Sequence, residues 1–487
     1  MLLLRRGNIT MNEGKKFRVY PTKEQIKTLS QWIGHQRFIY NSKVGEDRYF
    51  RKFKNKSLSL IGEDVPCDQK YSQFISADTD FLKDVPSQIL RNGVYRWMSA
   101  YQRFFKKLSG RPTIKKKHGR QSVMITKELF TFYSVDPKTA MINLGTKKHT
   151  IGPIRVNVHL EYEVPATIYI SVHGGKWYVS FSNENELAVA TEAELLADLQ
   201  HLTEEQLMDV ASGFARNVIA PVASSNGSTF DSAAGQKRSL QKALMGKVKC
   251  QKLLFKKQKG SSSRRKAVKK VGRYDRKISD IRNDFAHKTS KSIVDAFESL
   301  LVFEDLGIKN MTASAKGTVE EPGKNVRQKA GLNRSILNAV WGRIKTYTRY
   351  KGLRKNKLTI EAPAHHSSQE CSRCSYTHTD NRPSQAEFIC QDCGFACNAD
   401  LNASLVIKKR GVRTVLNNEV HIKIPKKIAF SKKSAIGPER SDRMLRHLSL
   451  RRECQPYQPK SRYAVLRWNR NPPLQLLRRF SGGRVHS

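Results

Sequence analysis

Four cysteines in the last third of the chain set the strongest constraint on its folding. Cys371, Cys374, Cys390 and Cys393 follow the spacing C-x2-C-x15-C-x2-C, which is typical of a tetrahedral zinc site with four thiolate ligands. Such a site has no open coordination position, so the metal is expected to be structural rather than catalytic. The spacing therefore predicts a small zinc ribbon at residues 367–397.

Two disulfides in a secreted protein are the alternative to zinc. The remaining cysteines, Cys67, Cys250, Cys397 and Cys454, are scattered, and no secretory signal with a small-residue cleavage site opens the sequence. Both observations favour zinc and a reducing compartment, which is the cytosol of a prokaryote or else a nucleus. Cys397 fits a buried small apolar residue better than a fifth ligand.

The charge of the chain indicates a polyanionic partner. Its 487 residues include 89 Lys and Arg against 42 Asp and Glu, a formal net charge of +47. Such an excess attracts phosphates and displaces their counterions, so binding to RNA or DNA is expected to weaken steeply with salt. No apolar run approaches the roughly 18 residues of a membrane span. The composition favours a nucleic-acid-binding protein, with an anionic membrane surface as the weaker alternative.

Apolar patterns organise the first half of the chain. The length suggests about three packed units at roughly 150 residues per domain. Apolar residues recur at helical intervals over 25–50 and 87–108, and a basic connector follows at 110–120. Between 123 and 184, short alternating runs bounded by Gly, Pro and Asn predict the strands of a small barrel or sandwich.

The second half is expected to combine buried strands with basic helices. An acidic, Leu-rich helix or linker covers 186–209, and intensely basic helices cover 236–291. The apolar run 299–306 has the length of a strand and ends in two acids, Glu304 and Asp305. After a short helix at 402–409, the remaining residues are rich in Lys, Arg, Pro and Ser, a composition typical of disorder without a partner.

Two acids are candidates for metal-dependent chemistry. Phosphodiester hydrolysis by two Mg²⁺ ions needs several carboxylates that converge on one point. Glu304 closes a buried strand and Asp400 begins a helix directly after the cysteines, so strand packing could bring both to one edge of a sheet. Each acid also has a simpler interpretation, as a strand-end residue at the surface or as a helix-start acid.

Several segments resemble the TnpB family of transposon-encoded RNA-guided DNA nucleases, which are relatives of the compact type V CRISPR effectors. VFEDLGIKNM (302–311) and SSQECSRCSYTHTDNRPSQAEFICQDCGFACNADLNAS (367–404) look like the second and third nuclease motifs with the intervening zinc finger. Further matching segments are RVYPTKEQ, RFIYN, VPSQILRNGV, FFKKLSGRPTIKKK, GKWYVSFSNE, RNDFAHKTSK and AVWGRIKTYTRYK.

The resemblance implies a multidomain fold of the α/β plus α+β class. It comprises an RNase-H-like (RuvC) nuclease core with a zinc ribbon, a helical recognition domain and a small β-barrel wedge domain that is split in sequence. The expected boundaries are 1–24 and 121–185 for the wedge barrel, 25–120 for the recognition domain, 186–366 and 398–410 for the nuclease core, 367–397 for the ribbon, and 411–487 for a basic, flexible tail.

The resemblance also implies the partners and the chemistry. The partners would be a guide RNA and double-stranded target DNA that carries a short adjacent motif, in the cytoplasm of a prokaryote and at its nucleoid, and no membrane. The oligomeric state stays open. In the family three acids bind the Mg²⁺ ions that cleave the DNA, and Glu304 and Asp400 occupy the second and third positions.

The first acid is missing from its expected place. The family's first motif reads Gly-hydrophobic-Asp, followed about ten residues later by Ser-Asp/Asn-Gly, and here Gly213-Phe214-Ala215 precedes Ser225-Asn226-Gly227. A methyl group cannot bind Mg²⁺, so this form of the protein is expected not to cleave DNA. Asp209 could substitute only in a different strand register. The alanine is either an engineered change in a nuclease or the mark of a natural, nuclease-dead repressor.

Further residues are candidates for nucleic-acid contacts, although each also fits an ordinary exposed polar residue. By resemblance, contacts near the adjacent motif fall to Gln88, Asn92, Lys115, Lys116 and Lys117, and phosphate contacts fall to Arg282 and Lys288. A non-enzymatic RNA-guided repressor is the main rival function. An RNA-binding assembly protein with a zinc ribbon is a weaker one, because it leaves the two acids unexplained.

Overall fold

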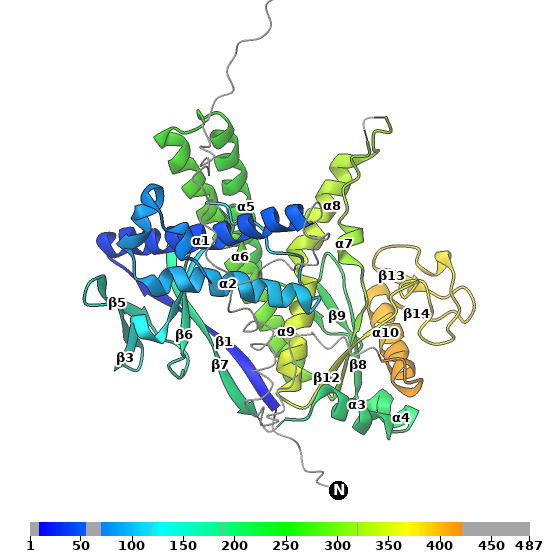
Figure 1. The fold of residues 1–487 in the computed structure, drawn as a ribbon. Coiled ribbons are helices and arrows are strands. Elements are labelled where there is room, and N and C mark those ends of the chain that lie inside the picture. The colour runs from blue at the N-terminus through cyan, green and yellow to red at the C-terminus, as the bar shows by residue number, and fades with distance from the viewer. Residues whose placement is uncertain (1–8, 55–69, 118, 188, 319, 421–487) are drawn as a thin grey trace, which may run out of the picture. The chain divides into compact units, whose positions relative to one another are not determined.

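The computed structural model describes residues 9–54, 70–117, 119–187, 189–318 and 320–420. These residues form two large sheets, each packed against its own helices, and a small cysteine ribbon (Figure 1). Most of the predicted tail, from residue 421 on, lies outside the described residues, as do Cys67 and Cys454.

The first sheet has seven antiparallel strands in the order β2-β6-β7-β1-β5-β4-β3. The strand that opens the chain lies between β7 and β5, so residues 9–20 share one sheet with residues 121–187. The strands are β1 (Ile9–Tyr20), β2 (Gln121–Thr126), β3 (Phe130–Asp136), β4 (Thr139–Gly145), β5 (Thr150–Asn157), β6 (Thr167–His173) and β7 (Lys176–Leu187).

The predicted barrel is not closed. Strands β2 and β3 are the two edges of the sheet, and no pairing among the described strands joins them. The prediction is therefore corrected to an open sheet. Alternating polar and apolar residues indicate strands and their buried faces, but closure depends on whether two edge strands meet, which is a non-local property.

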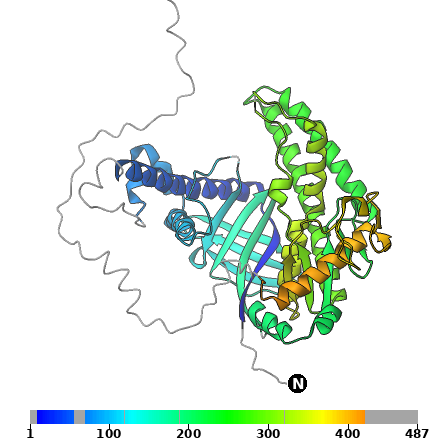
Figure 2. The ribbon, with the colours of Figure 1, turned by 90° about the vertical axis from the view of Figure 1, so that its right-hand side faces the viewer.

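Two helices lie where the helical periodicity predicted them, and both pack on this sheet. Helix α1 (Lys23–Lys54) begins after Pro21, where Thr22 and Gln25 exchange backbone and side-chain hydrogen bonds of 2.9 and 3.3 Å. Helix α2 (Ser87–Phe105) follows a 3-10 helix, Ala77–Asp84. Trp32 and Trp97 from these helices share one buried cluster with Phe17 of β1, and Figure 2 shows α1 beside the sheet.

The second sheet has five strands in the order β10-β9-β8-β11-β12. Its strands β8, β11 and β12 run parallel, and β9 and β10 are antiparallel to their neighbours. Every residue of β8 and β11 is buried, which fits central strands covered on both faces. The bounds are β8 (Ala211–Ala215), β9 (Val222–Ser224), β10 (Thr229–Phe230), β11 (Leu300–Glu304) and β12 (Leu358–Ala362).

Helices cover both faces of this sheet (Figure 1). Phe303 of β11 packs in a cluster with α6 (Ser262–Ala296) and α9 (Trp341–Leu353), and Val302 packs in another with α3 (Glu192–Gln200), α4 (Glu204–Val210) and α10 (Ala399–Leu416). The other helices are α5 (Ala234–Phe255), α7 (Ile308–Met311) and α8 (Val326–Ala339). The acidic segment 186–209 thus contributes α3 and α4.

Two glycines allow α10 to lie directly on the sheet. A Cβ at Gly213 of β8 would stand 2.0 Å from the carbonyl oxygen of Ser404, and one at Gly411 of α10 would stand 2.4 Å from a methyl of Val302. Backbone and side chain approach too closely at these points for any larger residue. This contact fixes where the first turn of α10, and with it Asp400, lies relative to β8 and β11.

Candidate functional site

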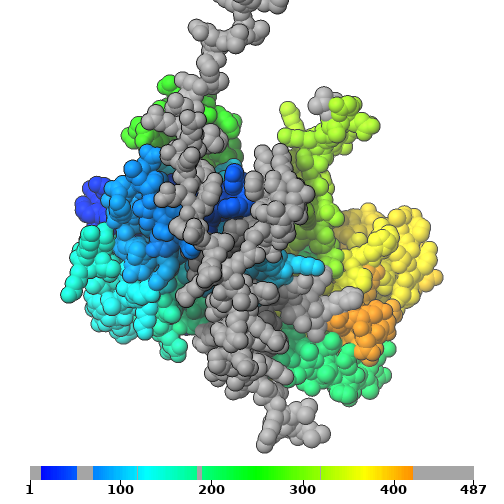
Figure 3. Space-filling model, in the orientation of Figure 1, coloured from blue at the N-terminus to red at the C-terminus, as the bar shows by residue number. Residues whose placement is uncertain are grey.

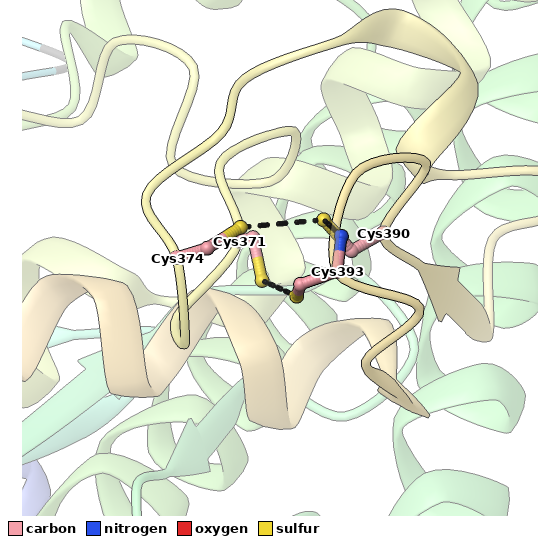
Figure 4. Close-up of side chains that lie close together, drawn as sticks. All are labelled: Cys371, Cys374, Cys390 and Cys393. Atoms are coloured by element: carbon pink, nitrogen blue, oxygen red, sulfur yellow. Dashed lines mark hydrogen bonds between the residues drawn. The ribbon is translucent and has the colours of Figure 1, made fainter.

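The four predicted metal ligands converge (Figure 4). Their Sγ atoms all lie within 4.8 Å of one another, and the Cys371–Cys393 and Cys374–Cys390 separations are 3.7 and 3.5 Å. Tetrahedral zinc with bonds of about 2.3 Å requires sulfur separations of about 3.8 Å. The arrangement therefore fits a metal ion and not a pair of disulfides. Cys397 lies on β14, half-buried and outside this group.

The ribbon is bonded to the start of α10. Its strands are β13 (Glu387–Ile389) and β14 (Ala396–Asn398). The Asn402 side chain donates to the carbonyl of Glu370 at 2.7 Å and accepts from the Ser372 N–H at 2.9 Å. Asn398 caps the helix by accepting from the N–H groups of Asp400 and Leu401. Figure 3 shows the ribbon (yellow) beside α10 (orange).

Three predicted site positions meet at the carboxyl end of the parallel strands. Ala215 is the last residue of β8, Glu304 is the last residue of β11, and the two strands pair in register through Phe214 and Phe303. Ala215 and Glu304 are 5% and 6% exposed. The chain directly after Ala215 contacts both acids: the Arg216 N–H donates to Glu304 Oε2 at 3.0 Å, and Asn217 Nδ2 donates to Asp400 Oδ2 at 2.5 Å.

A buried arginine accompanies the buried acid. The Arg216 side chain is 1% exposed, and its Nε lies 3.9 Å from Glu304 Oε2. Its Nε and Nη2 atoms have no hydrogen-bond partner among the described residues. Burial lowers the pKa of Arg216, which the charge of Glu304 opposes. Arg216 was not among the site residues predicted from the sequence.

The environment of Glu304 perturbs its ionisation. Burial raises the pKa of Glu304, and the charge of Asp400 acts in the same direction. Arg216 and the hydrogen bonds from its N–H and from Ser367 Oγ, which donates to Glu304 Oε1 at 3.1 Å, oppose this rise. The two carboxylates are therefore close enough to interact. Asp400 also has its own cation, because Arg382 Nη2 of the ribbon lies 3.9 Å from Asp400 Oδ1.

These residues do not fit a two-metal centre as they stand. Magnesium needs several free, ionised oxygen ligands. Here Ala215 offers none, both Glu304 oxygens accept hydrogen bonds from the protein, and one Asp400 oxygen accepts from Asn217. A guanidinium beside each acid also opposes a nearby divalent cation.

Asp209 does not substitute for the missing acid. It is exposed and lies on α4, because β8 begins only at Ala211. The alternative strand register is therefore wrong. The residues 203–210 form a capped helix, with Thr203 and Gln206 exchanging hydrogen bonds at its start.

The predicted nucleic-acid contacts fall into different environments. Asn92 is 2% exposed, and its amide donates to Met124 O and Thr126 Oγ1 at 3.3 Å, so a nucleic-acid contact through this side chain does not fit the structure. Gln88 is half-buried on α2. Lys116 and Lys117 are exposed, whereas Lys115 is partly buried.

The two predicted phosphate contacts lie on α6. Lys288 is exposed and pairs with Asp284 at 2.9 Å. Arg282 is half-buried, bonds to Asn338, and has a pKa lowered by burial and by Arg343. The same helix also lines a cavity of about 590 Å³ that was not predicted from the sequence. Cations at its wall include Lys176, Lys270, Arg273, Arg276 and Lys277. None of the described helices is long and apolar enough to cross a membrane.

Family models match three successive parts of the chain. A helix-turn-helix domain matches residues 11–44, which here form β1 and part of α1. A model described as "Probable transposase" matches residues 216–315, and the Cas12f1-like TNB domain matches residues 341–407.

Two named relatives match most of the chain, and a third matches about a quarter of it. InsQ of Escherichia coli (strain K12), named for RNA-guided DNA endonuclease activity, is 29% identical over 406 residues, 81% of this chain and 91% of InsQ. A Streptomyces pristinaespiralis protein named for the same activity is 26% identical over 82% of this chain and 89% of its own length. A TnpB-like protein of Aquifex aeolicus (strain VF5) is 32% identical over 139 residues, 26% of this chain and 40% of its own length.

Solved structures give a weaker likeness. A Cas12f1–sgRNA–target DNA complex covers 82% of this chain and 99% of the Cas12f1 chain, with a TM-score of 0.48 and 13% identity. CasPhi-2 bound to crRNA covers 84% of this chain and 99% of its own, with a TM-score of 0.34 and 11% identity. The chain is thus similar over about four fifths of its length to two proteins named as putative RNA-guided DNA endonucleases, and over a shorter stretch to a TnpB-like protein.

Proposed function

We propose that this protein is an RNA-guided DNA-binding protein whose family cleaves target DNA with metal ions, and that this chain does not cleave. The observation that carries the proposal is Ala215, which ends β8 beside Glu304 and near Asp400. Similarity to proteins named as RNA-guided DNA endonucleases supports guided DNA recognition, and the missing ligand supports loss of the chemistry.

The second sheet supports an RNase-H-like (RuvC) core. Its parallel strands β8 and β11 deliver residues 215 and 304 to a common end, where ligands of open α/β sheets usually bind. Helix α10, pressed on the sheet at Gly213, adds Asp400. With an aspartate at 215, the three acids would offer carboxylate ligands for Mg²⁺, which would supply charge stabilisation for phosphodiester hydrolysis.

In the present chain these residues act differently. Arg216 and Ser367 hold Glu304 in place, and Asn217 and Arg382 hold Asp400. The four cysteines, which we propose bind zinc, support the ribbon that carries Arg382 and abuts α10. The site is therefore positioned by the protein itself, and Ala215 contributes no ligand for a metal ion.

The charge distribution supports a guide RNA and double-stranded DNA as partners. Base pairing with the guide would supply sequence specificity, while the protein contacts phosphates and the short adjacent motif. We propose Arg282, Lys288 and the cations that line the α6 cavity as phosphate contacts. The cytoplasm of a prokaryote, at its nucleoid, is the compartment that these partners imply.

A natural RNA-guided repressor is the second candidate function. It is favoured by the environment of the two acids, because both already have partners within the protein, as expected of a site that has adapted to the absence of metal. A nuclease inactivated by an engineered alanine is the other explanation.

A restoration assay tests both versions. The RNA that copurifies with the protein is sequenced, and DNA that matches it is supplied together with Mg²⁺. Three forms are compared: the unaltered chain, Ala215→Asp, and, as the control, Ala215→Asp with Asp400→Asn. Cleavage by the single variant alone supports an inactivated nuclease. Guided binding without cleavage by any form supports the repressor. Binding of RNA with no guided binding of DNA contradicts the proposal and favours an RNA-assembly role.

A further inference from the structure

A small cationic cavity lies away from the acids, where α1, α2 and β2 meet the basic connector. Its volume is about 160 Å³, roughly five times the volume that one molecule occupies in liquid water. The residues that line it are Ile33, Arg37, Arg96, Lys115, Lys116, Gly119, Arg120 and Ser122. Five of these side chains are cationic, and none of the described lining residues is acidic.

The two arginines from the helices are fixed in place by neutral groups. Arg96 of α2 donates to Gln36 Oε1 at 3.0 Å, to Ser122 O at 2.9 Å and to Ser122 Oγ at 3.1 Å. Arg37 of α1 donates to Gln121 Oε1 at 2.7 Å. Because these acceptors carry no charge, they orient the guanidinium groups without neutralising them.

The connector is fixed at Lys115 in a similar way. The Lys115 N–H donates to Asn41 Oδ1 at 2.8 Å, and Asn41 Nδ2 donates back to the Lys115 carbonyl at 3.0 Å. Lys115 Nζ lies 3.3 Å from the centre of the Tyr40 ring, a cation–π contact. The ammonium group is therefore held by an aromatic ring rather than by a carboxylate.

The result is a group of like charges without a counterion from its own walls. Burial lowers the pKa of Arg37. Burial and the nearby charge of Arg120 lower the pKa of Arg96. Burial and Arg96 lower the pKa of Lys115 to about 7. An anion in the cavity would favour the charged form of each group and so oppose these shifts.

We infer that this cavity binds one phosphate group of a nucleic-acid backbone. Its size suits a phosphate with a few waters, and guanidinium forks match phosphate oxygens. The inference rests on the proposed function only in taking nucleic acid as the source of the phosphate. The cavity includes only part of the predicted Lys115–Lys117 contact, because Lys115 and Lys116 line it and Lys117 does not.

The test compares two charge-matched double variants of the full chain. Lys116→Gln with Arg120→Gln removes two exposed cations of the cavity, and Lys127→Gln with Lys138→Gln removes two exposed cations outside it. The probes are a labelled DNA duplex of arbitrary sequence and a labelled single-stranded RNA, titrated at several KCl concentrations. Thermal unfolding of each variant checks that its fold is retained.

The cavity pair is expected to weaken binding about tenfold at low salt and to reduce the slope of log K against log salt by about 1, as for one lost phosphate contact. The control pair is expected to leave the slope unchanged. A loss with RNA alone assigns the phosphate to RNA, and a loss with the duplex alone assigns it to DNA. Equal losses in both pairs, or none in either, overturn the inference. Because the probes are unguided, the result is independent of whether guided DNA binding occurs.

Discussion

At the scale of single residues, Arg216 is the side chain on which the acid site depends. It is buried next to Glu304, and removing one partner of a buried ion pair leaves an uncompensated charge. We expect Arg216→Met to lower the free energy of unfolding by about 3 kcal/mol, measured by urea denaturation. Adding Glu304→Gln should recover most of the loss, because the charge left behind is then gone.

The matched comparison is the Glu304→Gln variant alone. If the effects of the two substitutions simply add in a double-mutant cycle, then Arg216 does not neutralise Glu304, and this account of the site is wrong.

The lowered pKa of Lys115 predicts that the stability of the protein depends on pH. Its pKa in the folded protein is lowered from 10.5 to about 7, so between pH 7 and about 10 the unfolded chain binds more protons at this position. Stability contributed by Lys115 therefore rises with pH across that window and is constant below it, where both states are charged. The slope is at most about 1.4 kcal/mol per pH unit.

The measurement compares the unaltered chain with Lys115→Met and, as control, with the exposed Lys116→Met. Between pH 7 and 9, the free energy of unfolding of the unaltered chain should increase relative to that of Lys115→Met. Its difference from that of Lys116→Met should stay constant over the same range. Parallel curves for all three would show that Lys115 keeps an ordinary pKa.

The sequence predicted that Glu304, Asp400 and Ala215 lie at the ends of secondary-structure elements, because each of these elements has a clear apolar pattern. It could not predict Arg216 beside Glu304, since that contact depends on how the chain leaves β8. Asn92 was predicted to contact nucleic acid because the sequence does not distinguish an exposed amide from a buried one that donates to a neighbouring strand.

At the scale of elements, Gly213 determines how closely α10 packs on β8. Gly213→Ala would place a Cβ 2.0 Å from Ser404 O and 2.6 Å from Lys408 N, both backbone atoms that cannot rotate away. We expect a loss of about 3 kcal/mol in the free energy of unfolding, at the upper end for overpacking. The control is Gly34→Ala in α1, where nothing lies within 4 Å, and it should stabilise by about 0.5–1 kcal/mol. Equal effects would contradict this packing.

Local patterns predicted the helices well and the sheet only in part. The periodic segments 25–50 and 87–108 became α1 and α2, and the run 299–306 contains β11. The segment 186–209, predicted as a helix or a linker, contains α3 and most of α4, and a capping box at Thr203 starts α4 just before a buried strand. The open edges of the first sheet were not predicted, because closure depends on whether two strands distant in sequence meet.

At the scale of the whole molecule, the ribbon links a metal site to the stability of the core. Cys371 packs with Phe388 and with Ala399 of α10, so loss of zinc should loosen the start of that helix. We expect one zinc per chain by elemental analysis. Cys374→Ser should abolish it and lower the melting temperature, because a structural zinc site contributes directly to folding.

Cys397→Ser is the matched control, since this thiol lies close in sequence but outside the ligand group. It should keep both the zinc and the melting temperature of the unaltered chain. Loss of zinc in both variants would make Cys397 a ligand, and retention in both would show that the four converging thiols do not bind the metal. In either case the ribbon would not position Asp400 in the way proposed, which requires Cys371 and its three partner cysteines to bind one zinc ion beside the first turn of α10.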